Sequence, residues 1–252
     1  MDTRPSRCLA AWVPDFPVLA VGVGIDAPVA VVDAEGARAV VVACSAAARE
    51  AGVRRGQRVR DAQRLLADLA VHVRDEAAEA RAFEPVAVAA ECLAAGVEIV
   101  RPGLLALDAR GPARYHGGEE KLAQLFREAI GELTTASGDS IGIGVGCADG
   151  TFAAMQAARQ DLIVEAGGSA AFLAPLPLAV LEQPQLARTL DTLGVRTLGA
   201  FAALPAASIA GRFGMVGIEA HRRARVQVAT SDGRAWLLAV EGGIWRAEGI
   251  YQ

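Results

Sequence analysis

Lysine is almost absent from this 252-residue sequence: Lys121 is the only one, and the other 24 basic residues are arginines. Enrichment in arginine and alanine is typical of a GC-rich genome, so the arginine count by itself indicates no ligand. The formal net charge is −4 and the isoelectric point is about 5.5. This balance argues against binding of nucleic acid through bulk positive charge. The location of the arginines therefore matters more than their number.

Paired cysteines and long apolar runs are also missing. The four cysteines, Cys8, Cys44, Cys92 and Cys147, are scattered and form no CxxC pair, which favours buried thiols over disulfides or a zinc site. No run of about 18 apolar residues is free of charge, glycine or proline, so we predict no membrane span. The N-terminus lacks the hydrophobic stretch and cleavage site of a signal peptide. We therefore expect a cytoplasmic protein.

Short apolar segments alternate with helical patterns in much of the chain, which predicts an α+β fold. Residues 7–13 are apolar and end before a proline, as expected for a buried strand. Residues 76–95 carry acidic side chains early, which suits a helix N-terminus. The following segments are predicted as a hairpin (97–100 and 103–108), a helix (118–134) and a glycine-rich strand (140–146). Together they give a β-α-β-β-α-β alternation.

The stretch between the first strand and the long helix is predicted to form a small α/β unit of its own. It contains strands at 29–33 and 39–43 and helices at 45–52 and 60–69, the first of them capped by Ser45. From Pro175 onward, prolines and glycines break the chain into short helices. Residues 234–251 contain two apolar runs around a Glu-Gly-Gly turn, which predicts a C-terminal β-hairpin.

This order of segments, together with several motifs, resembles the Y-family translesion DNA polymerases. The most specific stretch, CSAAAREAGVRRGQRVRDA at 44–62, is similar to the fingers segment of that family. The motifs WVPDFPV (12–18), RPGLLALD (101–108) and AFLAPLP (171–177) look closest to the non-catalytic ImuB subgroup, a component of the bacterial mutasome. The resemblance covers roughly residues 7–225.

The resemblance implies a domain organisation. It predicts a ferredoxin-like βαββαβ palm (7–25 and 75–170), an inserted α/β fingers unit (26–74), a helical thumb-like segment (171–225) and a C-terminal hairpin tail (226–252). In the family, a little-finger domain of roughly a hundred residues follows the thumb. Here the thumb-like segment passes almost directly into the closing hairpin. We therefore expect the little finger to be absent and the chain to be internally shortened.

The resemblance also locates the metal site of the family. Active members hold two Mg²⁺ ions with a carboxylate of the first strand and an Asp-Glu pair of the later hairpin. These positions match Val13, Gly103 and Leu104, and none of them offers the oxygen ligands that Mg²⁺ requires. The sequence therefore predicts no catalytic residues, no metal and no cofactor, and a protein that is not an enzyme.

Two rival readings stay open. In the first, Asp15, Glu98 and Asp108 form a displaced metal site, which would make the protein an active polymerase. Asp15 lies two residues beyond Val13, on the same face only if the strand stays regular. In the second, the chain is a non-functional shortened remnant that binds neither DNA nor partner proteins.

Little remains of the nucleotide pocket that the resemblance implies. Active relatives contact the triphosphate through a Tyr and an Arg of the fingers helix, and these positions match Ala46 and Arg49. Arg49 is therefore a candidate for a residual nucleotide-phosphate contact, with an ordinary exposed helix arginine as the alternative. The glycines at 142–146 lack the spacing of a phosphate loop and suit a palm strand.

The densest arginine cluster falls in the predicted fingers unit. Since guanidinium groups pair bidentately with phosphate oxygens, we predict that this cluster contacts primer-template or damaged DNA in a salt-dependent way. The predicted contacts are Arg54, Arg55, Arg58 and Arg60, with a second set in the thumb-like segment, Arg212, Arg222 and Arg223. The alternative is a solvated surface of an arginine-rich proteome.

The resemblance implies a role in DNA repair and SOS mutagenesis, as a scaffold that supports translesion synthesis by a partner polymerase. The implied partners are an error-prone C-family DNA polymerase, the sliding clamp and a RecA-like accessory protein. No glutamine-led motif rich in Leu or Phe stands out in the sequence, so the sliding clamp is the least supported of the three.

Overall fold

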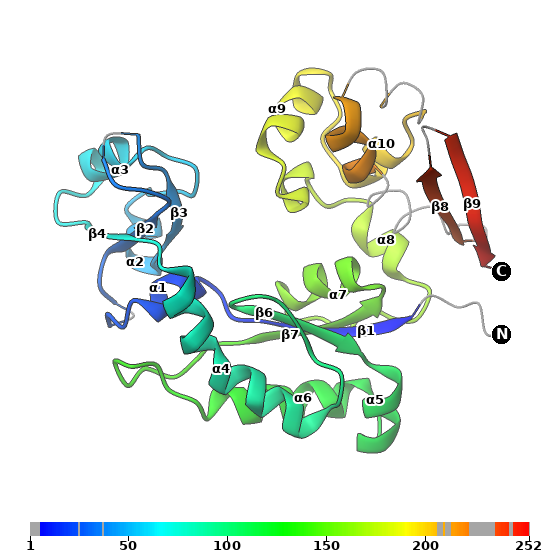
Figure 1. Ribbon diagram of the computed structural model, residues 1–252, viewed down its shortest axis with the longest axis horizontal. Helices are drawn as coiled ribbons and strands as arrows, with labels where there is room; N and C mark the ends of the chain where they lie inside the picture. The colour runs from blue at the N-terminus through cyan, green and yellow to red at the C-terminus, as the bar shows by residue number, and fades with distance from the viewer. Residues whose placement is uncertain are drawn as a thin grey trace.

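The computed structural model of the protein describes residues 6–24, 26–36, 38–205, 209, 213–221, 235–241 and 244–251. Figure 1 shows a sheet with helices on both faces, and two further units that stand on the same side of it. One of these units is built around strands β2–β4 and the other around helices α8–α10. No helix within these described ranges is long and apolar enough to cross a membrane.

The central sheet has four antiparallel strands in the order β5-β6-β1-β7. Their bounds are β1 (Arg7–Trp12), β5 (Glu98–Arg101), β6 (Leu104–Asp108) and β7 (Gly144–Asp149). In this order the first strand lies between the last and the third, which is the topology of a ferredoxin-like βαββαβ unit. The α+β fold expected from the sequence is therefore confirmed. The two inner strands are almost fully buried because helices cover both faces.

One face of the sheet is covered by α4 (Glu76–Leu93) and α6 (Glu119–Gly131), with the short α5 (Arg110–His116) beside them (Figure 1). Phe83, Phe126 and Ile130 are at most 1% exposed and pack against the sheet. Helix α4 begins where it does because the Asp75 side chain accepts a hydrogen bond from the backbone N–H of Ala78.

The opposite face is covered by α7 (Thr151–Ala158), which lies unusually close to β7. A Cβ atom added at Gly144 would lie 2.1 Å from the carbonyl oxygen of Ala158, and one at Gly146 would lie 2.1 Å from the Ala158 nitrogen. These two positions therefore require glycine for packing. The chain then continues into α8 (Ser169–Leu173), the 3₁₀ helix η1 (Leu178–Leu181), α9 (Pro184–Thr192) and α10 (Leu198–Ala202), whose apolar residues extend the same core.

The unit built on β2–β4 lies between β1 and α4 in the sequence. Strand β2 (Val29–Val32) pairs antiparallel with β3 (Val41–Cys44) and parallel with β4 (Ala70–Val73). Helices α2 (Ala46–Glu50) and α3 (Val59–Leu65) belong to the same unit, and the Ser45 side chain caps α2 by accepting from the Ala48 backbone N–H. Helix α1 (Phe16–Ala20) joins this unit to the central sheet, and its Phe16 ring meets the Phe83 ring edge-on.

The chain ends in a hairpin of β8 (Ala235–Glu241) and β9 (Ile244–Tyr251), of which the backbone is described. This agrees with the hairpin expected from the apolar runs at 234–251. Residues 213–221 are helical, an element that the sequence patterns did not single out.

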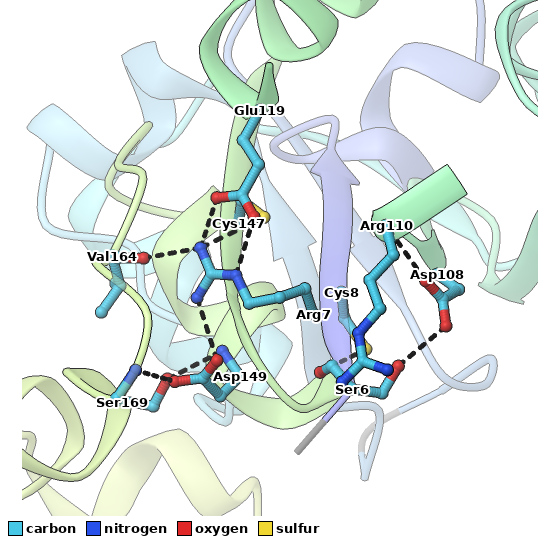
Figure 2. A network of polar contacts seen from close by, with 11 residues as sticks. Ser6, Arg7, Cys8, Asp108, Arg110, Glu119, Cys147, Asp149, Val164 and Ser169 are labelled. Carbon is cyan, nitrogen blue, oxygen red and sulfur yellow. Dashed lines mark hydrogen bonds and ion pairs between the residues drawn. The ribbon is translucent and has the colours of Figure 1, made fainter. Parts of the chain in front are cut away.

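A buried ionic network ties the start of β1 to the segment that leads into α8 (Figure 2). The Arg7 guanidinium forms ion pairs with Glu119 and, at 3.1 Å, with Asp149, and donates a 2.8 Å hydrogen bond to the carbonyl oxygen of Val164. Asp149 in turn accepts hydrogen bonds from the Gly167 backbone N–H at 2.6 Å and from the Ser169 hydroxyl at 3.3 Å. The network therefore links three elements of the palm to the helical segment that follows.

Candidate nucleic-acid interface

The three positions that match metal ligands in the family are filled by apolar packing. Val13 is 2% exposed, Leu104 is 3% exposed, and the Val13 N–H donates a 2.9 Å hydrogen bond to the Gly103 carbonyl oxygen. Gly103 has φ +84°, and a Cβ atom there would lie 2.5 Å from the Cβ of Phe16. No room for a carboxylate remains at this point. The residues present therefore do not fit a magnesium site.

The structure does not bring together the three carboxylates of the rival metal site. Asp108 lies opposite Cys8, whereas Leu104 lies opposite Trp12, so Asp108 is about 13 Å along the strand from the expected ligand position. Glu98 is exposed on the outer strand β5. Within the described part of the chain, no three His, Cys, Asp or Glu side chains form a possible metal site.

Asp15, two residues beyond Val13, and Arg49, the candidate for a phosphate contact, bind each other. The guanidinium of Arg49 donates two hydrogen bonds to the carboxylate, at 2.9 and 2.7 Å, and a third to the Cys44 carbonyl oxygen at 3.0 Å. The hydrogen bond to Asp15 is the main reason why the pKa of Arg49 is raised. A phosphate contact by Arg49 would require this bidentate pair to open, and it stays a prediction.

The predicted DNA-binding arginines of the fingers unit lie on and beside the loop between α2 and α3. Arg54, Arg55, Arg58 and Arg60 are all exposed. Arg54 donates hydrogen bonds to the carbonyl oxygens of Arg49 and Val53, which anchor its guanidinium to the backbone. No hydrogen bond or ion pair joins the side chains of Arg55, Arg58 or Arg60 to another described residue. Their role in DNA binding stays a prediction, as does that of Arg212, Arg222 and Arg223, which lie outside the described residues.

A second group of charged residues lies next to the expected metal positions and was missed by the sequence reasoning. We call it the palm arginine pair, and it consists of Arg101 at the end of β5 and Arg159 just after α7. Both guanidinium groups contact the Glu182 carboxylate, Arg159 at 2.8 Å and Arg101 at 3.6 Å. The Arg159 guanidinium also stacks over the Trp12 ring, 5.3 Å from its centroid. Glu182 caps η1, so it reaches the palm from the thumb-like segment.

The position of the palm arginine pair follows from the register of the sheet. Arg101 and Trp12 both lie opposite Leu104, on either side of β6, and Trp12 lies opposite Gly144 of β7. Helix α7 returns antiparallel to β7, which places Arg159 near Gly144 and Trp12. The pair therefore lies at the same end of the sheet as Val13 and Gly103, and opposite to the end that holds the Arg7 network.

Burial and nearby positive charges both lower the pKa of Arg101. Desolvation lowers the pKa of its guanidinium most strongly, Glu182 opposes that change, and the charges of Arg159, Arg55 and Arg74 lower the pKa further. Arg74 is neutralised locally by Glu76 and Glu79. Among the described residues that cause this shift, Glu182 is the one carboxylate, whereas Arg159, Arg55 and Arg74 contribute positive charge.

Comparison with solved structures shows the class of fold. DinB from Sulfolobus solfataricus matches with a TM-score of 0.69 and 16% identity, over 87% of this chain and 66% of that chain. A Y-family DNA polymerase chimera of Dbh and Dpo4 matches with a TM-score of 0.67 at 16% identity, over 88% of this chain and 67% of that chain. The fold is therefore that of the Y-family DNA polymerases. The chain spans about two thirds of the length of these relatives.

The sequence carries the family assignment. The model of the impB/mucB/samB family matches residues 25–158, which is just over half of the chain. This protein belongs to the impB/mucB/samB family. No curated protein matches the sequence significantly.

Proposed function

We propose that this protein is a non-catalytic member of its family, which binds primer-template or damaged DNA and supports translesion synthesis by a separate polymerase. One observation carries the proposal: the three positions expected to hold metal ligands lie in apolar packing, whereas the arginines at 54–60 are exposed on the fingers unit. Phosphoryl transfer needs cations to neutralise the developing charge. Phosphate binding needs only the arginines.

The motifs at 12–18, 101–108 and 171–177 support a finer assignment to the ImuB subgroup. On this proposal the protein acts in the cytoplasm during the SOS response, within a mutasome. Its partners are an error-prone C-family DNA polymerase, a RecA-like accessory protein and, with less support from the sequence, the sliding clamp. The polymerase would supply the chemistry, and this protein would supply contacts to the DNA.

Two assays on the same purified protein test the proposal. Fluorescence anisotropy of a labelled primer-template should report binding that weakens as salt rises. Primer extension with Mg²⁺ or Mn²⁺ should give no product under conditions in which the DNA is bound. Template-directed extension that is lost in Asp15→Ala or Asp108→Ala would establish the displaced-carboxylate polymerase instead. Absence of binding even at low salt would favour a non-functional remnant.

A further inference from the structure

The palm arginine pair has the geometry of an anion site. Both guanidinium groups approach the same oxygen of Glu182, Oε1, at 2.8 Å for Arg159 and 3.6 Å for Arg101. Two guanidinium groups that converge on one anionic oxygen are typical of sites that bind phosphate, because each offers several donors in a fixed plane. The side chains of Arg101, Arg159 and Glu182 are 38%, 33% and 43% exposed. A solvent-borne anion can therefore reach the pair.

The surroundings hold the arginines in place without neutralising them. The Trp12 ring lies under the Arg159 guanidinium and restrains it through a cation–π contact. The charge of Arg55, a fingers arginine, also acts on Arg101 and lowers its pKa. Glu182 is the one carboxylate within the described residues that forms ion pairs with Arg101 and Arg159. Its removal would leave two adjacent cations facing solvent.

We propose that Arg101 and Arg159 bind one phosphate of a nucleic-acid backbone, and that Glu182 occupies this site as an internal counter-ion when no DNA is bound. This inference rests on the proposed DNA-binding function. A phosphodiester carries the same single negative charge as the Glu182 carboxylate, so the exchange leaves the local charge unchanged. A nucleoside triphosphate carries several more charges and would need metal ligands, which Val13, Gly103 and Leu104 do not provide.

The exchange would also change a contact between two parts of the chain. Glu182 follows η1 in the thumb-like segment, and the two arginines belong to the palm. When a phosphate takes the site, the bridge from Glu182 to the palm is released. Binding of DNA at the arginine pair would therefore compete with this contact between the thumb-like segment and the palm.

The test compares two variants that remove one negative charge from the thumb-like segment. Glu182→Gln removes the proposed counter-ion, and Asp191→Asn removes the acidic partner of Arg196 in an exposed ion pair of the same thumb-like segment. Anisotropy of a labelled primer-template should show that Glu182→Gln binds about two- to five-fold more tightly than the wild type, the equilibrium factor that a partly exposed ion pair is worth. Asp191→Asn should bind like the wild type.

The arginine variants complete the test. Arg101→Ala and Arg159→Ala should each weaken binding and reduce the slope of log affinity against log salt by about one. In the double variant Arg101→Ala/Glu182→Gln, most of the tighter DNA binding seen with Glu182→Gln alone should be lost. Thermal melts check that the arginine variants fold, and misfolding cannot produce the gain in Glu182→Gln.

Competition with dATP without metal distinguishes the source of the phosphate. If dATP displaces DNA from the wild type, and does so better from Glu182→Gln, the backbone assignment is wrong.

The outcomes separate this inference from the proposed function. Salt-dependent binding by the wild type, with Glu182→Gln no tighter than Asp191→Asn, would overturn the inference and leave the proposed function standing. Binding by Glu182→Gln but not by the wild type would support the counter-ion and refute DNA binding by the natural protein. If no variant binds at low salt, both ideas fail.

Discussion

Gly103 shows why a carboxylate side chain cannot be accommodated at the position that was expected to match a metal ligand. Its backbone has φ +84°, a conformation that costs residues with a Cβ about 1–2 kcal/mol. A Cβ atom would also lie 2.5 Å from that of Phe16 and 3.2 Å from the Val13 carbonyl oxygen. Phe16 and the Val13 carbonyl group therefore occupy the space that a side chain at this position would need. A carboxylate placed there would have to displace Phe16 from its contact with Phe83.

We expect Gly103→Ala to lower the free energy of unfolding by more than Gly96→Ala. Gly96 has φ +74° and open space around it, so its variant reports the backbone cost alone. The difference between the two variants should be about 1–3 kcal/mol, which is typical of overpacking in a core. Urea unfolding at neutral pH measures both values. Equal losses of unfolding free energy in the two variants would show that Phe16 moves aside without cost.

The Arg7 network gives a second effect at the residue scale, a dependence of stability on pH. The hydrogen bond from Arg7 is the largest cause of the lowered pKa of Glu119, and it outweighs the opposing effect of burial. A carboxylate whose pKa is lower in the folded state stabilises the protein at pH values above its unfolded pKa of about 4.3. That contribution is lost as the pH falls through the folded pKa.

We therefore expect Glu119→Gln to be less stable than the wild type at pH 7, with a difference that shrinks as the pH is lowered below about 4. Glu120→Gln is the matched control, because Glu120 is an exposed neighbour in the first turn of α6. Urea midpoints between pH 7 and pH 3 give the comparison. A difference that stays constant with pH would mean that Glu119 acts through packing and not through its charge.

At the scale of single elements, the contact between α7 and β7 explains two of the glycines at 142–146, Gly144 and Gly146. Gly144 and Gly146 have the Ala158 backbone within 2.1 Å of where a Cβ would stand, while Gly142 has nothing within 4 Å. The spacing of two residues puts Gly144 and Gly146 on the same face of the strand. The glycine run is therefore a packing feature of the palm and not a phosphate loop.

We expect Gly146→Ala to push α7 away from the sheet and to lower the free energy of unfolding by about 1–3 kcal/mol or more. Gly142→Ala should change it by a few tenths of a kcal/mol, because the added methyl group meets no atom. Thermal unfolding of the two variants tests this. Similar melting temperatures would show that α7 shifts without loss of packing.

The same elements show how far sequence patterns reach. The long helix α4 and the hairpin of β5 and β6 were predicted near their observed bounds, because an acidic start and a Pro-Gly turn mark them clearly. The last palm strand was expected at 140–146 but lies at Gly144–Asp149, since glycines concealed where the pairing with β1 begins. Helix α7 was missed because Thr151–Ala158 is apolar or small on almost every side, which gives no helical periodicity.

At the scale of the whole molecule, one part of the candidate site could be predicted from the sequence and the other part could not. The arginines at 54–60 form a local cluster, so the chain order alone identifies them. The palm arginine pair and its partners come from distant parts of the sequence. They meet because β1, β5 and α7 finish at the same end of the sheet, which brings together Trp12, Arg101, Arg159 and Glu182. The phosphate contact predicted for Arg49 stays a prediction, and its bidentate pairing with Asp15 could be seen only in three dimensions.

Net charge and local charge make opposite predictions for DNA binding by the whole molecule, and a salt series distinguishes them. The chain carries −4 overall, yet Arg58 and Arg60 are exposed on the fingers unit. If these two arginines contact phosphates, Arg58→Ala/Arg60→Ala should weaken binding and reduce the slope of log affinity against log salt by about two. The control, Arg114→Ala/Lys121→Ala, changes the net charge equally but lies on α5 and α6, across the sheet from the fingers unit (Figure 1). Equal effects of the two double variants would mean that overall charge governs binding, whereas a change confined to Arg58 and Arg60 would place the DNA against the fingers.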